Sequence, residues 1–137
     1  MSLLLERLEL SLSNRAIVKD VTLNVDPGEV VGLLGPNGAG KTSTFNMIVG
    51  LVKPDFGNIH LEGNCIKNLS MTKRVKLGIG YLAQEPSVFR NLTVAENLDI
   101  ALSQSGLSKS ISRNRREELI EEFNLASFLH RNGHQLS

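Results

Sequence analysis

The chain has 137 residues, of which 41% are hydrophobic and 21% are charged, and its formal net charge is +1. This length and composition fit one compact domain that folds in water, and they are far from those of a disordered chain or a membrane span. The small net charge creates no general field that would attract nucleic acid or anionic lipid, so an anion-binding site has to be local.

The N-terminus and the cysteine content bear on the cellular compartment. Residues 1–7 do not combine a basic start with a long apolar stretch, and nowhere do 18 apolar residues follow one another. We therefore expect a chain that is neither exported nor membrane-spanning. Cys65 is the single cysteine and has no metal-ligand spacing around it, which favours a reducing compartment and a small buried side chain.

The first third of the chain reads as strands. Apolar and polar residues alternate over residues 3–10 and again over residues 21–25, which predicts two strands with one face on a core. The turn Asp-Pro-Gly at residues 26–28 follows. The apolar run at residues 30–34 then predicts a short strand that is buried on both faces.

A glycine-rich loop follows this run. Residues 35–42 read Gly-Pro-Asn-Gly-Ala-Gly-Lys-Thr and match the pattern G-x-x-x-x-G-K-[ST] at every specified position, between a predicted strand and a predicted helix. The glycines let backbone N–H groups curl around phosphate oxygens, Lys41 would neutralise phosphate charge, and the Thr42 hydroxyl would ligate Mg²⁺. We therefore predict a nucleoside triphosphate site, most simply for ATP. The residues predicted to bind the nucleotide are Gly35, Pro36, Asn37, Gly38, Ala39, Gly40, Lys41, Thr42 and Ser43.

Helical spacing begins at Lys41 and places one set of apolar side chains on a common face. This face consists of Phe45, Ile48, Val49 and Val52. Gly50 and Pro54 mark the end of the helix. A hairpin is then predicted over residues 59–66, with its turn at residues 62–64.

Helices and one further strand are predicted after the hairpin. Ser70 is expected to cap a short basic helix that reaches Gly78, and residues 79–82 are expected to form a strand. Thr93 and Glu96 fit a capping box, so a helix should start at Val94. Another helix, over roughly residues 113–123, presents the apolar side chains Leu119, Ile120 and Phe123. Strands that alternate with helices predict an α/β core, here followed by a helical tail.

The charged clusters have ordinary structural interpretations. Lys73, Arg74 and Lys76 are expected on a solvated helix face and not on a nucleic-acid patch. The acidic residues at positions 117–122 follow basic residues at positions 113–116, which favours i,i+4 pairing along the helix over paired catalytic carboxylates. Surface or packing roles are expected for His60, His130 and His134.

The sequence resembles the ABC transporter ATPase family, because residues 33–42 are close to that family's version of the loop. Residues 80–85, Gly-Tyr-Leu-Ala-Gln-Glu, resemble the family's Q-loop. The resemblance implies that Gln84 is catalytic and approaches Mg²⁺ and the attacking water. Residues 89–98 are similar to the start of the family's helical subdomain, which implies a partner interface at Phe89 and Arg90.

The resemblance implies a fold and an assembly. The fold class is α/β: a P-loop NTPase core of the ABC ATPase type with an antiparallel β subdomain over about residues 1–88, and the start of a helical subdomain over about residues 89–137. Residues 79–90 look most like those of ATP-binding subunits that energise lipopolysaccharide export. The implied partners are ATP, Mg²⁺, transmembrane transporter subunits and, in the full-length form, a second copy, with no nucleic acid. The implied location is cytoplasmic, at the inner face of the membrane.

Several family features do not occur in the sequence. Leu12 stands where an aromatic side chain usually stacks on adenine, which puts base selectivity in question. No acidic residue after Thr42 follows four consecutive apolar residues, so the strand that carries the general base is missing. Residues 135–137 only begin the family signature, and no switch histidine follows, so the fold is expected to be incomplete at its C-terminus and hydrolysis by this chain alone to stay near background.

Two alternatives stay open from the residues. A non-catalytic nucleotide-binding or regulatory fragment would keep the loop without transport activity, whereas another P-loop enzyme is disfavoured because no Asn-Lys-x-Asp run occurs. In the family, later strands lie between the strand before the phosphate loop and the strand before the Q-loop. We therefore predict that residues 30–34 and 79–82 share no hydrogen-bonded ladder.

Overall fold

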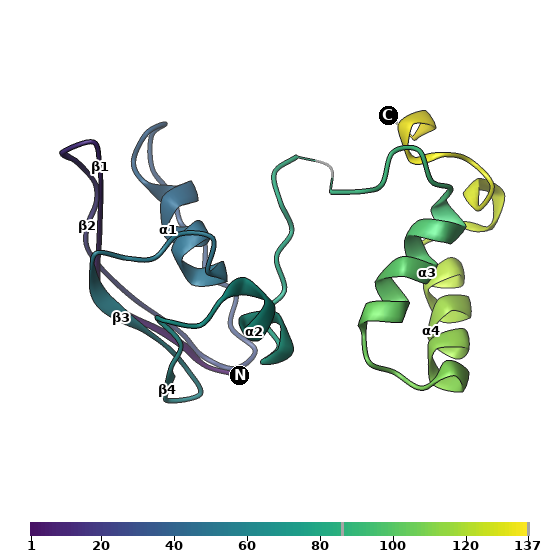
Figure 1. Ribbon diagram of the computed structural model, residues 1–137, viewed down its shortest axis with the longest axis horizontal. Coiled ribbons are helices and arrows are strands. Elements are labelled where there is room, and N and C mark those ends of the chain that lie inside the picture. The colour runs from purple at the N-terminus through teal and green to yellow at the C-terminus, as the bar shows by residue number, and fades with distance from the viewer. Residues whose placement is uncertain (86, 137) are drawn as a thin grey trace. The chain divides into compact units, whose positions relative to one another are not determined.

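The computed structural model describes residues 1–85 and 87–136, and the chain forms two compact units, Met1–Tyr81 and Leu82–Ser137 (Figure 1). The first unit contains β1 (Leu3–Leu12), β2 (Arg15–Val25), α1 (Lys41–Val49), β3 (Phe56–Leu61), β4 (Asn64–Cys65) and α2 (Met71–Lys76). The second contains α3 (Val94–Gln104), α4 (Lys109–Glu122) and the 3-10 turns Ala126–Phe128 and Gly133–Gln135. Among the helices of the described residues, none has the length and apolar character needed to cross a membrane.

The first unit is built on a four-stranded antiparallel sheet with the order β2-β1-β3-β4. β1 lies in its middle, where Leu5 pairs with Leu23 of β2 and with Ile59 of β3. The pairing shifts between Leu5 and Leu8, so both of these residues are fully buried although they stand three positions apart. The bulge thus replaces the simple alternation that the sequence suggests.

The bulge also lets β3 approach β1 closely. Gly57 has φ +83, and a side chain there would run into the main-chain carbonyls of Glu6 and Arg7. Glycine is therefore the residue that this crossing requires.

Helix α1 covers the core beside the sheet, as Figure 1 shows. It begins at Lys41 and ends at Gly50, whose φ of +85 and N–H donation to Asn46 O make a left-handed C-cap, as predicted. Its inward face agrees with the predicted one in part, because Val49 is buried and Ile48 and Val52 pack against the core. Thr44 and Met47 are buried, whereas Phe45 is 46% exposed. The buried stripe is thus shifted from Phe45 toward Thr44 and Met47, and both β2 and α2 contact the helix.

The strands predicted at residues 30–34 and 79–82 are wrong. Neither run is a strand, and Val30, Leu34 and Leu82 are more than 90% exposed. A strand is stable only when a neighbour pairs with it, and within the described part of the chain no ladder reaches either run. The prediction that the two runs share no ladder is confirmed.

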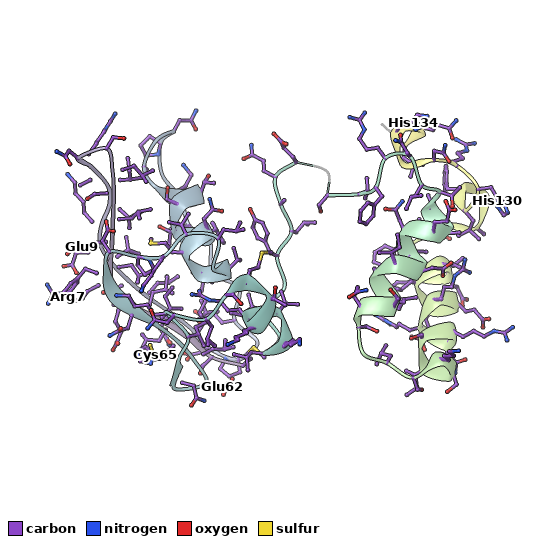
Figure 2. All side chains as sticks on the ribbon, in the orientation of Figure 1. Arg7, Glu9, Glu62, Cys65, His130 and His134 are labelled. Atoms are coloured by element: carbon purple, nitrogen blue, oxygen red, sulfur yellow. The ribbon has the colours of Figure 1, made fainter. Side chains whose placement is uncertain are left out.

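Two predictions about single residues in the first unit are also wrong. Cys65 is exposed because β4 has only two residues and lies at the sheet edge, which Figure 2 shows. Arg74 is 1% exposed and so does not lie on a solvated face. Ser70 is the N-cap residue of α2, as predicted, but its side chain makes no capping hydrogen bond.

The second unit is built on α3 and α4, which lie side by side. The capping box of α3 is present as predicted, with the Thr93 and Glu96 side chains each bonded to the other's backbone N–H. The prediction for α4 missed its start, because Ser108 caps the helix and Lys109 begins it. Arg116 Nε lies 2.7 Å from Asp99 Oδ1 and ties the two helices together.

The predicted charge pairing along α4 is confirmed. Arg113 lies 3.6 Å from Glu117 in the i,i+4 arrangement. His134 Nδ1 lies 2.9 Å from the Arg90 carbonyl, and Figure 2 shows His130 and His134 close to the C-terminus of the second unit. Of the begun signature at residues 135–137, Ser137 lies outside the described residues.

Candidate nucleotide-binding site

The glycine-rich loop at residues 35–42 joins the exposed run at residues 30–34 to helix α1. Ala39 N donates to Pro36 O over 3.2 Å, which closes a turn at its tip. Gly38 has φ +82, and an added Cβ there would meet nothing within 4 Å. The loop backbone at Gly38 therefore faces open space and is accessible to a ligand, and only glycine adopts this conformation without strain.

Gly40 anchors the other end of the loop. Its φ is +84, and a Cβ there would lie 2.6 Å from Ile17 O and 3.0 Å from Val18 Cγ2. The main chain at the start of α1 is thus pressed against β2 with no room for a side chain. This contact fixes where α1 begins.

The N-terminus of α1 has unoccupied hydrogen-bonding capacity. Gly40 is the N-cap residue and makes no side-chain cap, and the first turn carries no acidic side chain. Thr42 is exposed, whereas the Thr44 hydroxyl donates to Gly40 O over 3.0 Å and is buried. The first-turn N–H groups and the positive end of the helix dipole therefore suit an anion, and the exposed Thr42 hydroxyl suits a hydrated cation beside it.

Lys41 lies back over its own loop. Its Nζ donates to Gly35 O and to Pro36 O, each over 2.7 Å. The structure thus brings the ammonium group and the two ends of the loop together. A cation held at this place, next to an uncapped helix start, is the donor set that a polyphosphate requires.

The residues predicted from the Q-loop and the partner interface belong to the second unit. Gln84 lies in an exposed bend, and Phe89 is 56% exposed. The backbone of Phe89 is fixed by Asn97, whose Oδ1 accepts from Phe89 N over 2.8 Å and whose Nδ2 donates to Phe89 O over 3.1 Å. Asn97 was missed by the sequence reasoning, since its spacing from Phe89 follows no local rule. Arg90 is exposed beside it.

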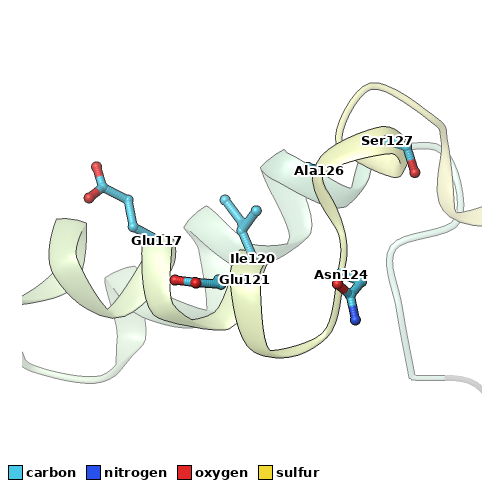
Figure 3. Close-up of a pocket in the computed structure, with 6 residues that line it drawn as sticks. All are labelled: Glu117, Ile120, Glu121, Asn124, Ala126 and Ser127. Atoms are coloured by element: carbon cyan, nitrogen blue, oxygen red, sulfur yellow. The ribbon is translucent and has the colours of Figure 1, made fainter.

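Two of the hollows in the second unit differ in chemistry. A cavity of about 380 Å³ beside α3 is lined mainly by apolar side chains, among them Val88, Phe89 and Leu136. An open hollow at the end of α4 holds the carboxylates of Glu117 and Glu121 (Figure 3). Nowhere in residues 1–85 or 87–136 do three His, Cys, Asp or Glu side chains gather as a metal site. The hollow on α4 therefore has no metal-binding geometry.

Comparisons with known proteins agree with the loop geometry. The model of the ABC transporter family matches residues 18–137. The chain is 50% identical over 133 residues to the lipopolysaccharide export system ATP-binding protein LptB of Haemophilus influenzae, covering 96% of this chain and 55% of that protein. It is 49% identical over 127 residues to LptB of Acidithiobacillus ferridurans, covering 93% and 53%. The chain thus spans about half the length of these curated relatives.

Solved structures give the same result. A structure described as the ATP-binding subunit of an ABC transporter superposes with a TM-score of 0.82 at 31% identity, covering 96% of this chain and 54% of that one. A nucleotide-free ATP-binding cassette from an ABC transporter superposes with a TM-score of 0.82 at 27% identity, covering 100% and 60%. Sequence, loop and fold agree, and the chain belongs to the ABC transporter family.

Proposed function

We propose that this chain is part of the ATP-binding subunit of an ABC transporter that energises the export of lipopolysaccharide or a related lipid. The observation that carries the proposal is the loop at residues 35–42, where Lys41 lies over an uncapped helix start. The export substrate is inferred from the relatives named LptB, which are about 50% identical to this chain.

The triphosphate is held by the backbone of the loop and by the first turn of α1. Lys41 leaves the carbonyls of Gly35 and Pro36 and donates to phosphate oxygens, whose negative charge compensates the ammonium better than two neutral carbonyls do. Mg²⁺ would be held by the Thr42 hydroxyl and by Gln84, and when bound it neutralises phosphate charge. Gln84 also orients the attacking water in this proposal.

The partners follow from the family. Phe89 and Arg90 form the surface that docks on a transmembrane subunit, and a second copy of the full-length subunit completes the ATPase. The chain then works on the cytoplasmic side of the membrane, attached through its partner. Aromatic and arginine side chains are those most enriched at energetically important interface positions.

The test of the nucleotide site is the affinity for Mg-ATP of wild type, Lys41→Ala and Lys53→Ala, measured by calorimetry. Lys53 is exposed just after α1, so its removal changes the charge by the same amount outside the loop. Losing a charge-assisted hydrogen bond costs roughly 1.5–3 kcal/mol, so Lys41→Ala should bind about ten to a hundred times more weakly. Lys53→Ala should bind as wild type does. Equal affinities of Lys41→Ala and wild type would exclude this site.

A further inference from the structure

The side chain of Arg74 is the largest that is fully buried in the described part of the chain, and the nucleotide site as proposed does not use it. It lies on the short helix α2 and is 1% exposed. Long charged side chains are seldom buried completely unless a specific set of partners holds them. Arg74 therefore has to satisfy its donors inside the first unit.

The partners of Arg74 are four main-chain carbonyls. Its Nη1 donates to Met47 O and to Ile48 O, each over 2.7 Å. Its Nε donates to Leu69 O and its Nη2 to Lys67 O, each over 3.0 Å. The planar guanidinium thus joins the end of α1 to the segment that leads into α2. A lysine could not reach all four carbonyls, because its three donors radiate from one atom.

The charge of Arg74 is balanced by dipoles. Within the described residues no carboxylate lies within 4.0 Å of it. Met47 and Ile48 belong to the last turn of α1, where carbonyls lack intrahelical partners and the helix dipole is negative. Burial lowers the pKa of Arg74, and the nearby Cys65 opposes that shift. The guanidinium therefore satisfies carbonyls at the end of α1 in addition to the C-cap at Gly50.

The same group occupies the space beside Gly50. A Cβ on Gly50 would lie 2.9 Å from Arg74 Nε, so the guanidinium packs directly on the turn that ends α1. At the opposite end of α1, Gly40 is pressed against Ile17 O. The helix is therefore held at both ends, by backbone packing at the phosphate loop and by Arg74 at its C-terminus.

A nine-residue helix transmits a tilt from one end to the other. Its length is about 13 Å at 1.5 Å per residue, and its hydrogen bonds keep it rigid. Release of the C-terminal end would let α1 pivot about the contact at Gly40. The first-turn N–H groups, with Lys41 and Thr42, would then point in a range of directions.

We propose that Arg74 is a positioning residue for the nucleotide site, which clamps the C-terminal end of α1 and thereby aims the first turn of α1 at the triphosphate. This inference rests on the proposed nucleotide binding. Arg74 touches no phosphate and acts only through α1. Pre-organised donors bind more tightly than mobile ones, because less ordering accompanies binding.

The test compares Arg74→Met, Arg74→Lys and Lys73→Met in the whole chain. Lys73 is the exposed neighbour on the same helix, so Lys73→Met makes the same charge change at a site without carbonyl partners. The Kd for Mg-ATP is measured at a temperature where each variant is fully folded, and amide hydrogen exchange is followed at residues 41–44 and in β1. Arg74→Met should raise the Kd about tenfold and speed exchange at residues 41–44 while β1 is unchanged. Arg74→Lys should fall between, and Lys73→Met should match wild type.

The outcomes separate positioning from mere stabilisation. A purely structural Arg74 would lower the unfolding midpoint and speed exchange in β1 as much as in α1, with the Kd of the folded chain unchanged, and this would overturn the proposal. If Arg74→Met does not fold, the Kd and the hydrogen exchange of Arg74→Lys distinguish the two roles by the same criteria. If Lys41→Ala binds as wild type does, the proposed nucleotide site fails instead. Exchange at residues 41–44 in Arg74→Lys then still decides whether the clamp exists.

Discussion

Gly38 and Gly40 have almost the same backbone conformation, with φ of +82 and +84, but different surroundings. Around Gly38 there is open space, whereas Gly40 is pressed against the backbone of β2. The loop pattern specifies glycine at position 40 and not at position 38, but it does not reveal what surrounds either residue. Of these two glycines, only Gly40 combines a positive φ with a lack of room for a side chain.

Alanine at each position separates these two requirements. Gly38→Ala should lower the free energy of unfolding by about 1–2 kcal/mol, because an L-residue is strained at positive φ. Gly40→Ala should cost at least about 1 kcal/mol more, because its Cβ would stand 2.6 Å from Ile17 O and something must move. Urea unfolding without nucleotide measures both. If both variants lose the same free energy of unfolding, then β2 moves away from the added Cβ at position 40 without a measurable energetic cost.

Single residues of the loop could be predicted from the sequence, whereas Arg74 could not. The loop has a spacing rule because a phosphate imposes one on consecutive residues. The partners of Arg74 are main-chain carbonyls on two separate segments. Because every residue has a main-chain carbonyl, the sequence does not indicate which carbonyls Arg74 binds. The two basic neighbours of Arg74 made a solvated face the simpler interpretation, which burial overturns.

At the scale of elements, the N-terminus of α3 makes a pH-dependent contribution to stability. The pKa of Glu96 is lowered first by the hydrogen bond from the Thr93 backbone N–H and then by that from the Thr93 hydroxyl. Since the folded pKa lies below the unfolded one, this stabilisation is complete above the unfolded pKa, about 4.3. It is lost as the pH falls through the folded value. The capping box should therefore weaken in acid.

Thr93→Ala tests this cap. At pH 7 it should lower the free energy of unfolding by about 1 kcal/mol, and the loss should shrink as the pH falls below about 4. Ser108→Ala is the matched control, because Ser108 caps α4 with no acidic side chain in the first turn. Its effect should not vary over the same range. Denaturant unfolding at several pH values measures both, and a pH-independent loss in Thr93→Ala would contradict the assignment to Glu96.

A local cap can be recognised in the sequence more directly than a pairing with a distant strand, although the cap of α4 at Ser108 was missed. The start of α3 follows from Thr93 and Glu96, which satisfy each other within one turn. Residues 30–34 are as apolar as a buried strand, yet they pair with nothing in the described chain. Strand propensity reports whether a side chain fits into a sheet, and it does not indicate whether a neighbouring strand is present to pair with it. Phe45 was misassigned to the buried face of α1 for the same reason, because α2 and β2 decide which residues of the helix are buried.

At the scale of the whole molecule, Phe89 tests the proposed contact with a transmembrane subunit. Phe89→Ala should weaken capture of that subunit about tenfold or more, because exposed aromatic anchors dominate interface energies. Phe123→Ala is the matched control, since Phe123 is 60% exposed on the same unit and Phe89 is 56% exposed. Capture by the immobilised chain measures both variants. Unchanged capture together with lower thermal stability of Phe89→Ala would assign Phe89 to local packing.

The boundary between the two compact units differs from the boundary between the predicted domains. Along the chain, the first compact unit ends at Tyr81 and the second begins at Leu82. The assignment of about residues 1–88 to the nucleotide core and about residues 89–137 to the helical subdomain is functional, and it stays a prediction. Gln84, which is proposed as the Q-loop glutamine, lies between these two boundaries in the sequence.

The strand order sets an order of events during folding. β1 meets β2 through a tight turn that ends at the pair Leu12 and Arg15, whereas β1 meets β3 only after residues 26–55 have been looped out. A hairpin forms in about 1–10 μs, and closing a longer loop costs more entropy before any contact rewards it. The phosphate loop and α1 lie inside that longer loop. We therefore expect the anion site to be among the last parts of the first unit to take shape, so that added nucleotide slows unfolding without speeding the first steps of refolding.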